Sequence, residues 1–217
     1  MRINDDDTLL FIGDSITDAG RDRADPASLG HGYVHEIART LRERAHDGPG
    51  PRVINRGIGG DRIYDLESRW AADVIGHRPT VVTVKIGIND TWRYHDSGLP
   101  SPVREFEACL DRLLADTARR LSARLVVITP FLLPVTPHQE GWFDDLSPRT
   151  DAVLRVAADH GAQLVRADLL LPRAAQDRPA AELAPDGVHP TPLGHRLIAD
   201  AWLAAVGVGA SAPQPKR

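Results

Sequence analysis

The chain has 217 residues, of which 42% are hydrophobic and 26% are charged, and its formal net charge is −4. The length suits one domain with a sizeable core, and the composition is ordinary for a globular protein. The mild charge argues against nucleic acid as a partner, and no stretch of the sequence approaches the roughly 20 apolar residues that a membrane span requires.

Short apolar runs alternate along the chain with helical patterns. The runs are bounded by turn residues and mostly rich in Val, Ile and Leu, which predicts buried parallel strands at Thr8–Ile12, Arg52–Asn55, Val81–Ile86, Leu125–Thr129 and Gln163–Arg166. Apolar residues three to four positions apart predict helices at Gly32–Ala45, Ile63–Ile75, Val103–Leu121, Pro148–His160 and Pro192–Val206. Two stretches rich in proline, glycine and aromatic residues, Thr91–Pro102 and Val135–Leu146, are predicted as long loops.

The alternation predicts an α/β fold, a three-layer α/β/α sandwich with a five-stranded parallel sheet in the flavodoxin-like order 2-1-3-4-5. We expect a single domain at residues 1–208 and a disordered tail at 209–217, where the residues are small or polar and include prolines. Ligands in such sheets bind beyond the carboxyl ends of the strands. Ser15, Gly60 and Asn89 each follow a predicted strand, so we expect them at that edge.

Two segments carry a nucleophile and its base. Gly13-Asp14-Ser15 follows the first strand, and a serine hydroxyl becomes a useful nucleophile when a base lies within hydrogen-bond reach. Asp186-Gly187-Val188-His189-Pro190 supplies His189 as the base, with Asp186 three residues earlier to fix its tautomer. Alone, Ser15 would be better explained as a helix cap, but the other segments favour catalysis. His195 is predicted to be structural.

Two further segments, Asn55–Asp61 and Gly87–Asp90, offer hydrogen-bond donors to an oxyanion. Gly60 supplies a backbone N–H where no side chain blocks approach, Asn89 supplies a side-chain amide, and Ser15 supplies its own N–H. Gly59 is adjacent to Gly60, and spacing does not decide between them. A phosphate-binding loop is disfavoured because the chain has no Gly-Lys-Ser/Thr. This chemistry requires no organic cofactor, and we expect no metal.

The one cysteine and the start of the chain bear on location. Because Cys109 is the one cysteine of the chain, no intrachain disulfide can form, and its apolar position in a predicted helix indicates a buried thiol. The acidic segment 1–7 lacks the apolar core of a signal peptide, so we expect a cytoplasmic protein.

In the segments that carry Ser15, Gly60, Asn89 and His189, the chain resembles the SGNH (GDSL-type) hydrolases. The resemblance covers the chain from about Thr8 to Val206. The resemblance implies the family roles for Ser15, Gly60, Asn89 and His189, with Asp186 as the triad acid. The stretches most similar to intracellular acetylxylan esterases are Leu9–Asp18, Gly32–Val34, Gly87–Arg93, Thr129–Phe131 and Val188–Pro190. One departure is Pro185, since an aromatic residue precedes the triad acid in that group. The group is often oligomeric, so a homo-oligomer is compatible with the resemblance.

The resemblance implies a serine esterase that removes acetyl groups from a small acetylated sugar, a xylo-oligosaccharide. Trp92 and Tyr94 follow Asn89 closely, and we place them by hypothesis near the leaving sugar, with loop or core packing as the alternative. Trp70, Trp142 and Trp202 are predicted to be structural. A short-chain lipid esterase or thioesterase is the first alternative, although no apolar insertion builds a groove for long acyl chains. A non-catalytic binding protein of the same fold is the second, and the intact residue set argues against it.

Overall fold

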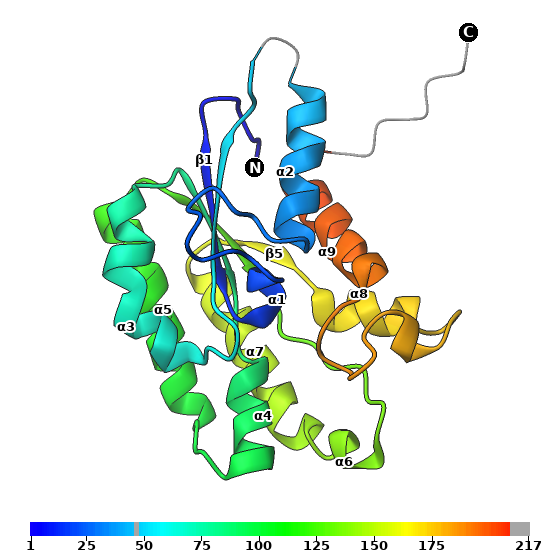
Figure 1. Cartoon of the computed structure of the whole chain (residues 1–217). Helices are drawn as coiled ribbons and strands as arrows, with labels where there is room; N and C mark the ends of the chain where they lie inside the picture. The colour runs from blue at the N-terminus through cyan, green and yellow to red at the C-terminus, as the bar shows by residue number, and fades with distance from the viewer. Residues whose placement is uncertain (46–47, 209–217) are drawn as a thin grey trace, which may run out of the picture.

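The computed structural model describes residues 1–45 and 48–208, so the tail predicted at 209–217 lies outside the described residues (Figure 1). The strands form one parallel sheet in the order β2-β1-β3-β4-β5, as the sequence predicts. Their bounds are β1 (Thr8–Gly13), β2 (Arg52–Gly57), β3 (Val81–Lys85), β4 (Arg124–Ile128) and β5 (Gln163–Val165). Gly13 at the end of β1 pairs with Gly57 of β2 and with Lys85 of β3, so the segments that follow these strands meet at one edge.

Helices cover both faces of the sheet, which gives the predicted three layers. Strand residues alternate between the faces, so Leu9 and Phe11 of β1 belong to one apolar cluster and Leu10 and Ile12 to the other. The first cluster is completed by α2 (Tyr33–Arg44), α8 (Ala167–Ala174) and α9 (Pro192–Ala205). The second is completed by α3 (Ile63–Asp73), α5 (Val103–Arg120) and α7 (Phe143–Asp159), and Figure 1 shows α3 and α5 on the side opposite α2 and α9.

The two long loops predicted from the sequence are wrong in part, because much of each is helical. Of the first stretch, Thr91–Pro102, residues 91–97 belong to α4 (Ile88–Ser97), and the second stretch contains α6 (Pro137–Glu140) and the beginning of α7. α7 therefore starts at Phe143 and not at Pro148, which lies inside the helix. Short elements that the sequence reasoning did not identify are α1 (Ser15–Asp18), η1 (Ile75–His77), η2 (Ala180–Glu182) and the helix α8.

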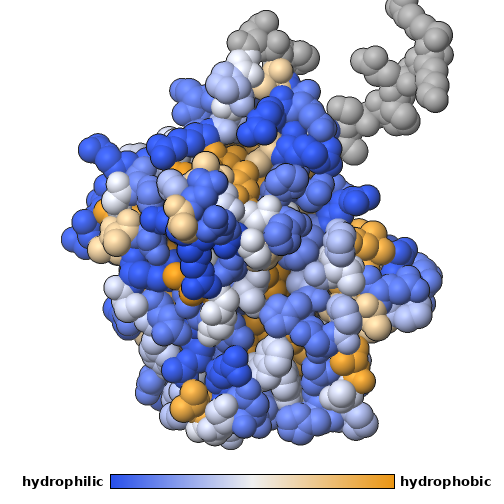
Figure 2. Space-filling model, in the orientation of Figure 1, coloured by the Kyte–Doolittle hydropathy of each residue, from blue (hydrophilic) through white to orange (hydrophobic). Residues whose placement is uncertain are grey.

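The surface agrees with the ordinary composition. Figure 2 shows a mainly hydrophilic face on which apolar residues gather in small, separate groups. In the part of the chain that the structure describes, every helix falls short of the length and apolarity needed to cross a bilayer.

Candidate active site

Ser15 stands at the first turn of α1, directly beyond the end of β1. Asp14 caps this helix, since its Oδ1 accepts the N–H of Ile16 at 3.0 Å, and its Oδ2 lies 2.9 Å from Nζ of Lys85. Both charged side chains are buried, with exposed fractions of 0% for Asp14 and 1% for Lys85. A Cβ on Gly13 would lie 2.1 Å from the carbonyl oxygen of Lys85, so only glycine fits there. This tightly packed turn fixes the backbone from which the Ser15 hydroxyl projects.

The hydroxyl of Ser15 meets the imidazole that the sequence predicted as its partner. Ser15 Oγ lies 2.8 Å from Nε2 of His189, and Nδ1 of His189 lies 2.5 Å from Oδ2 of Asp186. The other carboxylate oxygen of Asp186 accepts the backbone N–H groups of Val188 and His189 at 2.9 and 2.7 Å. The structure thus brings all three predicted residues together, although 171 or more positions separate the serine from the other two.

The environment of Asp186 keeps its carboxyl group ionised. Partial burial raises the pKa of Asp186, but the hydrogen bonds from the His189 ring and from the two backbone N–H groups lower it by more. The net pKa lies below the ordinary value of an aspartate. A carboxylate that accepts the Nδ1 proton leaves Nε2 of the ring with its lone pair toward Ser15.

The loop that carries Asp186 and His189 is held by the segment after β4. Leu133 donates its N–H to the carbonyl of Gly187 at 2.8 Å, and the side-chain amide of Gln139 donates to the carbonyl of Asp186 at 2.7 Å. Gly187 has a φ of +84°, and a Cβ there would lie 2.6 Å from the carbonyl oxygen of Leu133. Sequence reasoning had missed Gln139, whose side chain also takes part in the capping box of α6.

The sequence left open whether Gly59 or Gly60 is the candidate oxyanion donor, and the hydrogen bonds distinguish the two N–H groups. The N–H of Gly59 donates to Oδ2 of Asp18 at 2.9 Å, so it is already engaged. Among the described residues the N–H of Gly60 has no acceptor, its φ is +89°, and the space where a Cβ would stand is open. Asn89, in the first turn of α4, donates one amide hydrogen to the carbonyl of Asp61 at 3.0 Å, and the second hydrogen is left for another acceptor.

The aromatic residues after Asn89 separate on α4. Trp92 is half-buried, with its ring centroid 5.8 Å from the His189 ring and 5.5 Å from the ring of Trp142. Tyr94 is 52% exposed and packs edge-on against the neighbouring His95. Residues two positions apart on a helix do not share a face. Trp92 therefore borders the triad, and a sugar contact by Tyr94 stays a prediction.

Four residues that the sequence predicted to be structural are buried, namely His195, Cys109, Trp70 and Trp202. Nδ1 of His195 accepts the N–H of Tyr33 at 3.2 Å, and burial lowers the pKa of His195 to about 4. Burial raises the pKa of Cys109 to about 12, so its thiol is protonated at neutral pH. Trp70 and Trp202 are buried and donate their indole N–H to Thr117 and Thr83. Over residues 1–45 and 48–208, no cluster of three or more His, Cys, Asp or Glu side chains is arranged to hold a metal ion.

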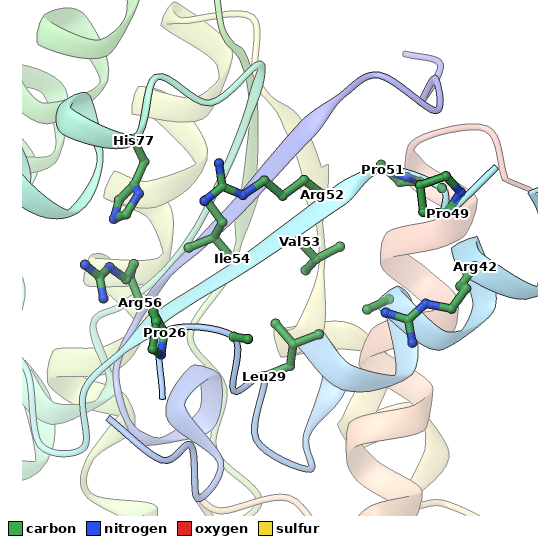
Figure 3. A pocket seen from close by; sticks show the side chains of 13 residues that line it. Pro26, Leu29, Arg42, Pro49, Pro51, Arg52, Val53, Ile54, Arg56 and His77 are labelled. Carbon is green, nitrogen blue, oxygen red and sulfur yellow. The ribbon is translucent and has the colours of Figure 1, made fainter. Parts of the chain in front are cut away.

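A hollow of about 490 Å³ lies elsewhere, along the edge strand β2 (Figure 3). Its lining includes Arg42 of α2, Arg52 and Arg56 of β2, and His77 of η1, around the apolar Val53. None of the predicted site residues lines it. The triad instead lies in an open position, since the side chains of Asp186 and His189 are each nearly half exposed.

A hydroxyl bonded to an imidazole that is itself bonded to a carboxylate can attack an ester carbonyl, and nearby N–H donors can stabilise the resulting oxyanion. This fold and this arrangement define a hydrolase of the SGNH type. The family model described as "GDSL-like Lipase/Acylhydrolase family" matches residues 11–197, and the chain belongs to that family. It is a carboxylic-ester hydrolase.

Its similarity to known proteins extends over nearly the whole chain. It is 34% identical to an acetylxylan esterase of Geobacillus stearothermophilus, over 95% of this chain and 97% of that protein. A solved variant of Axe2, an acetyl xylan esterase of the same organism, superposes with a TM-score of 0.89 at 32% identity, covering 98% of this chain and 100% of the other. LAE5, an alpha/beta hydrolase from the metagenome of Lake Arreo, Spain, gives 0.86 at 34% identity, covering 97% and 99%. Other solved Axe2 structures are catalytic mutants in which a serine, a histidine or an aspartate is replaced by alanine.

Proposed function

We propose that the protein is a serine esterase that removes O-acetyl groups from xylo-oligosaccharides through an acyl-enzyme intermediate. The observation that carries this proposal is the hydrogen-bonded chain from Ser15 Oγ to His189 Nε2 at 2.8 Å and from His189 Nδ1 to Asp186 Oδ2 at 2.5 Å. The catalytic mutants of Axe2 replace the same three residue types, which supports the assignment of Ser15, His189 and Asp186 as a triad.

In the proposed first half-reaction, Ser15 attacks the acetyl carbonyl while Nε2 of His189 takes the hydroxyl proton. The negative charge on the carbonyl oxygen is bound by the N–H groups of Ser15 and Gly60 and by the free amide hydrogen of Asn89. His189 then gives its proton to the sugar oxygen, the carbon–oxygen bond to the sugar breaks, and the acetyl group stays on Ser15. Water, deprotonated by His189, releases acetate and restores the hydroxyl.

The proposed substrate class rests on the relatives and on Trp92. The Geobacillus relative is named for its action on acetylated xylan. The half-buried indole beside His189 is suited to pack against the C–H face of a sugar that leaves from this side of the triad.

Hydrolysis and active-site labelling test the catalytic proposal. The protein is expected to hydrolyse p-nitrophenyl acetate and to be labelled on Ser15 by a serine-directed phosphonate. Ser15→Ala should lose both, and Ser147→Ala, which changes a serine of α7 outside the site, should lose neither. An unlabelled, inactive wild-type protein would support the alternative of a non-catalytic binding protein.

A comparison of substrates tests the acyl and sugar specificity. We expect kcat/KM to be highest for acetylated xylose and xylo-oligosaccharides, and to be lower than this both for octanoyl esters and for acetyl-coenzyme A. Faster hydrolysis of octanoyl or coenzyme A esters would instead favour the lipid esterase or thioesterase. A cytoplasmic location and assembly into a homo-oligomer remain predictions from the sequence, and sedimentation of the purified protein tests the second.

A further inference from the structure

The buried carboxylate of Asp18 lies at the end of α1, one turn after Ser15. Its Oδ2 accepts the N–H of Gly59 at 2.9 Å and the guanidinium of Arg23 at 2.7 Å, and its Oδ1 accepts the backbone N–H of Arg21 at 3.1 Å. Only 7% of the residue is exposed. The proposed mechanism uses none of these groups, yet Asp18 is three positions from Ser15 and Gly59 is adjacent to Gly60.

The segment 58–61 supplies or orients two of the proposed oxyanion donors. Gly60 offers its own N–H, and the carbonyl of Asp61 fixes the amide of Asn89 at 3.0 Å. The segment is attached at its start by the N–H of Ile58, which donates to the carbonyl of Gly13 at 3.0 Å. In its middle stand two glycines, which restrict backbone rotation least of all residues. The bond from Gly59 to Asp18 restrains that middle.

The bond also decides which N–H of the two glycines is left for an oxyanion. Because Asp18 engages the N–H of Gly59, the peptide before Gly59 is held with its hydrogen toward α1. The next peptide along the chain carries the N–H of Gly60, and once the peptide before Gly59 is held, only the φ and ψ of Gly59 remain to reorient it. Without Asp18, the turn would be closed only by the N–H of Asp61 on the carbonyl of Ile58 at 3.3 Å, which leaves the peptide between the two glycines able to flip, and the donor would have to be ordered again in each catalytic cycle.

The negative charge of Asp18 is neutralised by a neighbouring arginine. A lone carboxylate beside the reaction centre would oppose an oxyanion, and the Arg23 guanidinium pairs with it at 2.7 Å. A Cβ built on Gly59 would lie 3.8 Å from Cβ of Ser15, 3.9 Å from Oδ2 of Asp18 and 4.0 Å from Nη2 of Arg23. The ion pair and Ser15 therefore both border Gly59, and the pair adds little net charge there.

We propose that Asp18 is a positioning residue for the oxyanion donors, and that it acts by holding the N–H of Gly59 so that the N–H of Gly60 faces the ester oxygen. This role rests on the proposed esterase function. It differs from a purely structural role in one measurable respect, since it acts on the transition state more than on substrate binding.

The chain offers a matched control in Asp7. Its carboxylate is equally buried, with 5% of the residue exposed, accepts a backbone N–H from Asn4 at 2.7 Å and pairs with Arg124. Asp7 precedes β1, at the end of the sheet opposite to Ser15. Asp7→Ala should therefore lower the thermal midpoint as Asp18→Ala does, and leave kcat unchanged.

The test measures kcat, KM and inhibition by an alkylboronic acid, which forms a tetrahedral adduct with a catalytic serine. For Asp18→Ala we expect kcat on p-nitrophenyl acetate to fall roughly tenfold to a hundredfold, somewhat less than when a donor is removed outright. KM should change less than about twofold, and the inhibition constant should rise by the same factor by which kcat/KM falls. Asp18→Asn keeps an acceptor oxygen for Gly59 and should recover most of kcat.

The outcomes separate the two proposals. A folded Asp18→Ala protein with wild-type kcat, or losses of kcat that are equal in the Asp18 and Asp7 variants, would overturn the role of Asp18 alone. A wild-type protein that neither hydrolyses esters nor is labelled on Ser15 would overturn the proposed function, and the role of Asp18 with it. If Asp18→Ala does not fold, Asp18→Ser decides in its place, because its hydroxyl is too short to reach Gly59.

Discussion

The ring of Trp92 lies next to the rings of His189 and Trp142, and the guanidinium of Arg93 lies over it, 5.7 Å from the ring centroid. The sequence predicted a loop here, in which Trp92 and Tyr94 could face the same sugar. On a helix, side chains two positions apart point to different sides, so only Trp92 can border the triad while Tyr94 is turned toward solvent. The secondary structure of this segment therefore separates the two aromatic side chains, and the sugar contact predicted for each of them is a separate prediction.

Replacing Trp92 by alanine should weaken binding of the sugar without disabling the triad. We expect KM for acetylated xylo-oligosaccharides to rise about tenfold, which corresponds to roughly 1.4 kcal/mol, the upper range for one aromatic contact. KM for p-nitrophenyl acetate, which has no sugar, should change much less. Tyr94→Ala is the matched control, expected to stay within about twofold on both substrates. Unchanged kinetics of Trp92→Ala on the oligosaccharides would remove Trp92 from the site.

At the scale of secondary-structure elements, the buried pair of Lys85 and Asp14 joins β3 to the turn between β1 and α1. Burial lowers the pKa of Lys85, and the adjacent carboxylate of Asp14 opposes that effect. The ammonium also lies 5.7 Å from the ring centroid of Phe131. A charge in this position has no access to water, so each member of the pair depends on the other.

Lys85→Met should therefore leave the carboxylate of Asp14 buried without its counter-charge. We expect the free energy of unfolding to fall by about 3–5 kcal/mol, measured by urea denaturation at pH 7. In the double variant Lys85→Met/Asp14→Asn the uncompensated charge is gone, so the loss should be smaller than in the single variant. Equal losses in the single and double variants would show that the pair contributes through packing alone.

The sequence was sufficient for the strands and for most of the long helices, because their apolar spacing is regular and the two faces of the sheet each bury one set of residues. It failed where a turn-forming residue stands at the end of a helix or inside it. Gly98 has a φ of +63° and terminates α4, so the stretch after Thr91 had the composition of a loop. Proline favours the first turn of a helix, yet Pro148 lies inside α7, which begins at Phe143, where packing of Trp142 and Leu146 in the first apolar cluster offsets one missing hydrogen bond.

The same limit applies to the site. Ser15, His189 and Asp186 were predictable because each belongs to a short motif whose chemistry requires that residue type. Gln139 and Asp18 were not, because their contacts with Asp186 and Gly59 depend on which loops the fold brings together. The preference for Gly60 over Gly59 likewise appears only when the acceptor of each N–H is known.

On the scale of the whole molecule, two buried groups link folding to pH in opposite directions. Burial lowers the pKa of His195 to about 4, so the unfolded chain binds that proton more readily than the native protein between pH 6.5 and 4. Its contribution to stability is complete above pH 6.5 and is lost as the pH falls through 4. Burial raises the pKa of Asp90 to about 6, so protonation of Asp90 stabilises the native state as the pH falls from 6 to 3.8.

A variant without the imidazole isolates the first effect. His195→Asn retains an acceptor for the N–H of Tyr33 but does not titrate, so its stability should depend less on pH. We expect the difference in unfolding free energy between wild type and variant to shrink by about 3 kcal/mol from pH 7 to pH 4, measured by urea denaturation across that range. His35→Asn, which changes an exposed histidine of α2, should leave the pH dependence as it is. A constant difference between wild type and His195→Asn would contradict the linkage.

The hollow along β2 affects whether the edge strands of two copies of the protein can pair in a concentrated solution. β2 is the outermost strand on its side of the sheet, and an outermost strand leaves backbone groups able to pair with another chain. Arg52 and Arg56 stand four positions apart on it, and Arg42 approaches from α2. Two such borders brought together would oppose like charges in a confined space. Like charges along this border therefore oppose pairing of β2 with the β2 of a second copy.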